Sequence, residues 1–173
     1  MTDSVASRRP VLMIGLDAAE ITLIQPWMTD GLLPNLAALH RRGVLMELQS
    51  TAHWLVGAPW PAFYASSTPE RFGMYHYLVW RPEKMAGERP SPTWMPLEPF
   101  WRQLPGNDRR VIAVDVPLCY APDAYDGIEL SGWATHELLQ KPGSSPPDLL
   151  DEIRREFGAA PFDEESAHEL SAA

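Results

Sequence analysis

The stretch that most limits the fold of this chain is residues 11–17, a run of apolar residues that ends in Asp17. An unbroken apolar run of this length is typical of a parallel strand that is buried on both faces of a sheet. Ligands of open α/β sheets bind outside the carboxyl ends of such strands. We therefore predict a buried first strand that places the Asp17 carboxylate at the ligand-binding edge of a sheet.

The rest of the sequence alternates between helix and strand patterns, with turn residues between them. We predict helices over residues 18–30, 34–42, 58–65, 98–104 and 146–157, and further strands over residues 44–48, 111–115 and 128–131. Residues 80–97 are rich in Pro, Arg and Glu without any period, which indicates an insertion on the surface. The fold class is therefore α/β, with a mostly parallel sheet flanked by helices in one domain over residues 1–160 and an acidic tail over residues 161–173.

Charge and composition exclude several classes of function. The net charge of −9 argues against binding to a nucleic-acid backbone, which requires clustered Lys and Arg. No apolar run approaches the roughly 20 residues of a membrane span, and no secretory leader is recognisable, so we expect a cytoplasmic protein without a membrane partner. The single Cys119 excludes an internal disulfide and fits a reducing compartment.

Short motifs along the chain are similar, in order and spacing, to those of a known family. They are Gly15-Leu16-Asp17, then Gly31-Leu32-Leu33-Pro34-Asn35-Leu36 with Leu39 and Gly43, then Pro59-Trp60 with Phe63, and later Val116-Pro117 with Tyr120, Pro122, Gly127, Ser131 and Gly132. Over residues 11–157 the chain resembles the N-terminal portion of the type I phosphodiesterase/nucleotide pyrophosphatase family, in the alkaline phosphatase superfamily.

The resemblance implies an alkaline-phosphatase-like core and a two-metal site that hydrolyses small phosphate esters. Asp17 matches the first metal ligand of the family, and the metal implied is divalent Zn, Mn or Mg. A carboxylate held at a strand end suits such an ion. The alternative is that Asp17 caps a helix that starts near Ala18, which is a common role of Asp.

The chain departs from the family at the catalytic positions. The family nucleophile, a Ser or Thr, falls on Val56 here, and a shifted register gives Leu55, Gly57 or Ala58, none of which can attack a phosphorus atom. The remaining family ligands include an Asp-His pair, and no such pair occurs in this sequence. We therefore assign no catalytic residue and expect this chain alone to be inactive. The alternative function is a non-catalytic binding or interaction module derived from the same fold, and the sequence identifies no partner chain.

Other residues have both a functional and a structural interpretation. His53 is either a ligand or base, or a packing residue in an aromatic loop, and Asp115 is either a site residue at a strand end or part of the turn before Pro117. Cys119 has no evident activating partner and is expected to be inert. The aromatic residues predict either a substrate pocket or a packed core: Trp54, Trp60, Tyr64, Tyr75, Tyr77 and Trp80.

Overall fold

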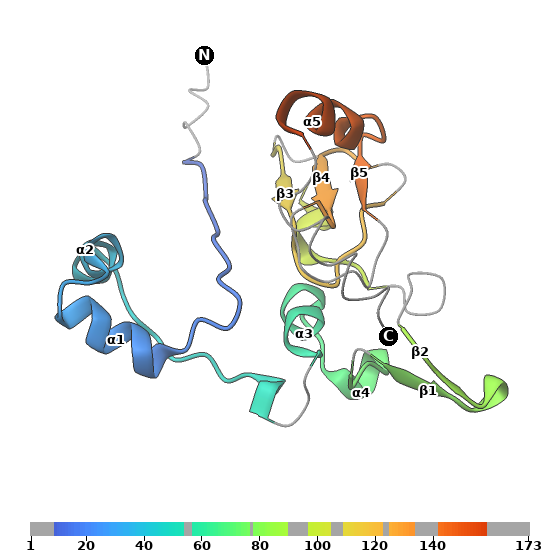
Figure 1. The fold of residues 1–173 in the computed structure, drawn as a ribbon, viewed down its shortest axis with the longest axis horizontal. Helices are drawn as coiled ribbons and strands as arrows, with labels where there is room; N and C mark the ends of the chain where they lie inside the picture. The colour runs from blue at the N-terminus through green and yellow to red at the C-terminus, as the bar shows by residue number, and fades with distance from the viewer. Residues whose placement is uncertain are drawn as a thin grey trace, which may run out of the picture. The chain divides into compact units, whose positions relative to one another are not determined.

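The computed structural model describes residues 9–53, 57–76, 78–89, 97–104, 109–122, 125–133 and 142–158. The described residues form a mixed α/β structure with five α-helices and two small sheets (Figure 1). The chain divides into two compact units, Met1–Leu48 and Gln49–Ala173. Within the described ranges, no helix combines the length and apolar character that crossing a bilayer requires.

The first unit contains two helices, α1 (Ile21–Thr29) and α2 (Pro34–Arg42). A tight turn joins them, in which Gly31 has a φ of +79°, a conformation that residues with a Cβ rarely adopt. Pro34 occupies the first turn of α2, where its missing N–H costs no hydrogen bond, and Gly43 follows the last residue. Both predicted helices are confirmed. They could be predicted because the residues that start and stop them lie next to them in the sequence.

The two strands predicted in this unit are wrong. Residues 11–17 and 44–48 form neither helix nor strand in the structure. Their side chains are largely exposed, from 57% at Leu16 to 88% at Val11 in the first segment, and none of residues 9–48 is buried. An apolar run reports a preference for burial, but a strand exists only where a second backbone pairs with it. Neither described sheet includes these two segments.

The second unit begins with short helices and a hairpin. Helices α3 (Pro59–Ala65) and α4 (Pro69–Phe72) are followed by strands β1 (Val79–Arg81) and β2 (Ala86–Glu88), which pair antiparallel. Helix α3 confirms the predicted helix. The hairpin is regular where the sequence shows no period, because three-residue strands are too short to show one. Residues 90–96 of the surface insertion predicted over residues 80–97 lie outside the described residues, so the insertion stays a prediction. Within the hairpin, the Lys84 ammonium forms an ion pair of 2.6 Å with the Glu88 carboxylate.

The second sheet has the strand order β3–β4–β5, formed by Ile112–Val114, Ile128–Ser131 and Gly143–Ser145. The β3–β4 pair is parallel and the β4–β5 pair is antiparallel, so the described strands do not confirm a mostly parallel sheet. Strands β3 and β4 confirm two predictions. Strand β5 was not predicted, since Gly and Ser are uncommon in strands.

Helix α5 (Leu149–Phe157) contacts β5 and confirms the last predicted helix, with a later start (Figure 1). The Ser144 hydroxyl oxygen on β5 accepts a hydrogen bond from the Leu150 N–H at 3.0 Å. This bond satisfies one of the unpaired N–H groups in the first turn of α5. Leu150 itself is buried, so the amphipathic helix docks by its apolar face.

The main hydrophobic core of the second unit contains Tyr64 on α3, Trp101 and Cys119. Trp101 lies in a 3₁₀ turn, Phe100–Gln103, where a short α-helix was predicted. The Tyr64 and Trp101 rings meet edge to face, with centroids 5.8 Å apart. The Tyr64 hydroxyl donates a hydrogen bond of 2.8 Å to the Leu118 carbonyl oxygen, and this bond ties α3 to the loop after β3.

We expect Tyr64→Phe to lower the free energy of unfolding by about 1–2 kcal/mol, because the buried Leu118 carbonyl loses its donor. Urea unfolding followed by tryptophan fluorescence measures this change. The matched control is Tyr125→Phe, whose exposed hydroxyl donates to the Ile128 carbonyl oxygen at 3.2 Å. Equal losses in the two variants would contradict a special role for the buried bond.

Candidate functional site

Asp17 lies in an exposed turn just before α1. The N-cap of α1 is Glu20, not Asp17: the Glu20 carboxylate accepts hydrogen bonds from the Thr22 N–H and the Thr22 hydroxyl, both at 3.0 Å. These bonds, the backbone one first, hold the pKa of Glu20 below its usual value. The interpretation of Asp17 as the helix cap is therefore wrong, and its role as a metal ligand stays a prediction.

A metal site needs several ligands that converge, usually three or more from the protein. Among the residues that the structure describes, no three His, Cys, Asp or Glu side chains lie close enough together to hold an ion. Asp17 alone does not fit a two-metal centre. We therefore derive no catalytic step through a metal from the described residues.

The position of the family nucleophile, Val56, lies outside the described residues, as do Trp54 and Leu55. Just upstream, Ser50 and Thr51 carry hydroxyl groups. The Ser50 hydroxyl oxygen accepts a hydrogen bond from the Ala52 N–H at 3.0 Å, and the Thr51 hydroxyl oxygen is buried. The Thr51 hydroxyl is therefore withheld from solvent, whereas Ser50 stays exposed.

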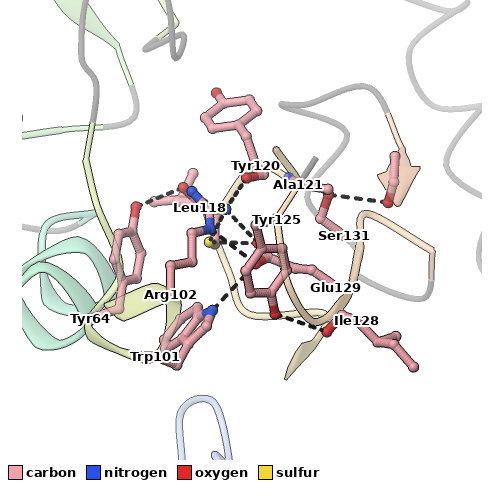
Figure 2. Close-up of polar contacts among 12 residues, drawn as sticks. Tyr64, Trp101, Arg102, Leu118, Tyr120, Ala121, Tyr125, Ile128, Glu129 and Ser131 are labelled. Carbon is pink, nitrogen blue, oxygen red and sulfur yellow. Dashed lines mark hydrogen bonds and ion pairs between the residues drawn. The ribbon is translucent and has the colours of Figure 1, made fainter. Parts of the chain in front are cut away.

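Among the described residues of the second unit, a dense polar cluster surrounds Glu129, which lies on β4 and is only 2% exposed (Figure 2). Arg102 donates to both carboxylate oxygens, from Nε to Oε2 at 3.0 Å and from Nη2 to Oε1 at 2.5 Å. The Trp101 indole N–H donates to Oε2 at 3.3 Å, and the Cys119 thiol lies 3.4 Å from Oε1. Both oxygens therefore have two partners each.

This saturation decides what Glu129 can do. A general base or metal ligand needs a lone pair that faces a substrate or an ion. The lone pairs of Glu129 are directed at Arg102, Trp101 and Cys119, and burial keeps water away from the carboxylate. The cluster is a structural ion pair rather than a reaction centre.

The ion pair fixes the loop that follows β3. Arg102 Nη2 also donates to the Tyr120 carbonyl oxygen, and the Ala121 N–H donates to the Ser131 hydroxyl oxygen at 3.1 Å. The Ser131 hydroxyl in turn donates to the Gly143 carbonyl oxygen on β5 at 3.4 Å. Figure 2 shows these contacts converging from the 3₁₀ turn, the loop and β4. The loop is thus held at several points.

Cys119 is buried in this cluster, and its burial, followed by the nearby Glu129 carboxylate, raises the pKa of the thiol. Only the thiolate is a good nucleophile or metal ligand. The expectation that Cys119 is inert is therefore supported by its surroundings. Burial also raises the pKa of Tyr64 in the same core.

Asp115 lies at the carboxyl end of β3 and adopts a φ of +48°, in the left-handed region. Its Oδ1 accepts a hydrogen bond of 2.9 Å from the Trp133 N–H, just after β4. Asp tolerates this backbone conformation better than most residues. The structural interpretation, a turn residue that links the ends of the two parallel strands, accounts for Asp115.

The predicted aromatic residues do not gather into one pocket within the described part of the chain. Tyr64 is buried and Trp60 is half-buried beside it, whereas Trp80 is 58% exposed on β1 and Tyr75 is 46% exposed. Trp54 and Tyr77 lie outside the described residues. His53 ends a short 3₁₀ turn, Thr51–His53, and is exposed.

Sequence reasoning missed the pair Arg102–Glu129. The strand Ile128–Ser131 alternates apolar and polar residues, a pattern that predicts Glu129 on an exposed face, so the sequence carries no signal of its burial. The partner lies 27 positions away in the sequence, and no pattern identifies it.

Comparison with known proteins gives one result that bears on identity. A family model described as type I phosphodiesterase/nucleotide pyrophosphatase matches residues 11–172. No curated protein and no solved structure matches this chain.

We expect Glu129→Leu to lower the free energy of unfolding by about 3–5 kcal/mol, because it leaves the Arg102 guanidinium buried without its partner. The double variant Arg102→Met with Glu129→Leu should lose less, since both charges are removed. Glu88→Gln, in the more exposed pair with Lys84, is the control and should cost less than about 1 kcal/mol. Urea unfolding of each variant measures these free energies. A double variant that is less stable than Glu129→Leu would contradict the cost assigned to the unpaired guanidinium.

We expect the native Cys119 thiol to resist a disulfide reagent such as DTNB at pH 8 and to react rapidly once urea unfolds the chain. Fast labelling of the native protein would refute this prediction.

The raised pKa of the Cys119 thiol also predicts that stability depends on pH. Above the ordinary thiol pKa of about 8.5, the unfolded thiol ionises while the buried one stays protonated, so stability falls as pH rises. Below that pH the thiol is protonated in both states, and its contribution to the free energy of unfolding is fully present. Cys119→Ala should remove this part of the pH dependence of the free energy of unfolding.

Proposed function

Because the chain belongs to the type I phosphodiesterase/nucleotide pyrophosphatase family, we propose that it derives from a metal-dependent phosphoric ester hydrolase, with Asp17 as a metal ligand. The observation that carries this proposal is the family match over residues 11–172. We further propose the alkaline-phosphatase-like core that the family implies, with a mostly parallel sheet. The parallel β3–β4 pair supports that core.

The position and exposure of Asp17 support its role as a ligand. It ends an apolar run, lies in an exposed turn, and is not needed to cap α1, since Glu20 does so. Carboxylate oxygens are ligands that divalent Mg, Mn and Zn accept. When bound in pairs, such ions stabilise the attacking and leaving oxygens of a phosphoryl group. The chain would supply one ligand to that site.

We also propose that this chain alone does not hydrolyse phosphate esters. Val56 stands where the family has its nucleophile, and valine carries no group that can attack. Of the two hydroxyls just upstream, that of Thr51 is buried, and that of Ser50 lies six positions before Val56. A small phosphate ester as substrate, the metal dependence and a cytoplasmic location all stay predictions.

The second candidate function is a non-catalytic interaction module. The observation that favours it is the exposed apolar surface of residues 11–16 and 44–48, where Leu12 is 83% and Met46 is 81% exposed. Large contiguous apolar surface commonly marks an interaction site. Metal binding at Asp17 distinguishes the two candidates, because an interaction module has no need of it.

The test uses substoichiometric Mn²⁺, whose unpaired electrons broaden the NMR signals of nearby nuclei even when binding is weak. We expect broadening of the Leu16 and Ala18 amide signals in the wild-type chain and its loss in Asp17→Asn. Asp30→Asn, which removes another exposed carboxylate of the same unit, is the matched control and should leave the broadening intact.

The same samples should show no turnover of bis(p-nitrophenyl) phosphate with Mn²⁺ or Zn²⁺. Hydrolysis that disappears in Asp17→Asn would refute the proposed inactivity while supporting the ligand. Broadening that is absent, or equally reduced in Asp30→Asn, would refute Asp17 as a ligand and favour the interaction module.

A further inference from the structure

An open surface groove of about 390 Å³ lies between helices α1 and α2 within the first unit. Its lining comes from both helices: Gln25, Met28 and Thr29 from α1, and Ala37, His40 and Arg41 from α2. The volume lies within the range of small-molecule sites, roughly 300–1,000 Å³. The groove has no part in the proposed metal site.

The lining residues have the same spacing on both helices. Residues three and four positions apart lie on one face of a helix, so each helix turns one continuous face to the groove. Met28 and Ala37 are half-buried, whereas the polar residues of the lining are exposed. The groove therefore has an apolar floor and a polar rim.

The rim supplies hydrogen-bond donors without any acid. Arg41 and His40 line it, and no Asp or Glu does, although the chain as a whole has a net charge of −9. Within the described residues, the side chains of Gln25, His40 and Arg41 make no hydrogen bond or ion pair. Thr29 is different, because its hydroxyl donates to the Gln25 carbonyl oxygen at 3.0 Å. Three donor side chains are thus available to a ligand.

We propose that the groove between α1 and α2 binds a small phosphate-bearing anion, held by Arg41, His40 and Gln25. The planar guanidinium of Arg presents paired N–H donors that match phosphate oxygens. The volume admits an organic group attached to the phosphate, and Met28 and Ala37 provide the apolar surface for it. This inference goes beyond the proposed function, because it requires neither Asp17 nor a metal.

The competing account is that the basic residues only complement the carboxyl end of α2. His40, Arg41 and Arg42 all lie in its last turn, where positive charge interacts favourably with the helix dipole. Arg42 shares this position and charge but does not line the groove. The pair Arg41 and Arg42 therefore separates a built site from general electrostatic attraction.

The experiment is an NMR titration of the full chain with inorganic phosphate and with phenyl phosphate, at constant ionic strength. We expect saturable shifts of signals from the groove residues, with phenyl phosphate also shifting the Met28 methyl signal. Arg41→Gln should weaken binding at least about tenfold, as expected for loss of a charged hydrogen bond. Arg42→Gln should bind as the wild type does, and so should Asp17→Asn.

Three results would overturn the proposal. One is shifts that grow linearly without saturation, and another is equal weakening by Arg41→Gln and Arg42→Gln, which indicates attraction by net charge alone. The third is binding of acetate at the same residues with the affinity of phosphate, because the site would then not distinguish phosphate from other anions. Retained phosphate binding in Asp17→Asn keeps this result independent of the proposed hydrolase site.

Discussion

The buried ion pair between Arg102 and Glu129 is the contact on which the described structure of the second unit depends most. Removing a carboxylate and a guanidinium from water is costly, and the cost is offset only where both groups find enough partners. Here the carboxylate has partners at both oxygens, and the guanidinium also reaches the Tyr120 carbonyl. The path of residues 118–121 follows from these bonds. Leu118, in that loop, then accepts the bond from Tyr64 that holds α3.

Helices could be predicted from the sequence because their determinants lie within one turn of the chain. Pro34 and Gly43 mark the ends of α2, and the apolar face of α5 is visible in its spacing. The strand over residues 11–17 could not be predicted in the same way. Its composition indicates burial, but pairing depends on a backbone elsewhere in the chain, and the structure gives this segment no strand partner in its described sheets.

The candidate site was predictable only in part, for a related reason. Asp17 was proposed from local motifs and lies in an exposed turn, and its role as a metal ligand stays a prediction. The helix-cap alternative was wrong because α1 begins later than predicted, and Glu20, three residues after Asp17, accepts the hydrogen bond from the Thr22 N–H. The groove between α1 and α2 was not anticipated. Its residues follow helical spacing on two helices, and that spacing shows which residues share a face, not which faces meet.

The distribution of polar groups limits where chemistry can occur in this chain. A fold does not carry an activity by itself; activity belongs to side chains with unused bonding capacity that face a ligand. In the second unit, the buried polar groups around Glu129 are committed to one another, and Asp115 is bonded to the Trp133 N–H. Membership of a hydrolase family therefore does not turn these residues into a reaction centre. The side chains with donors to spare, His40 and Arg41, lie instead on the rim of a groove in the first unit, where the charge of Arg41 suits an anion.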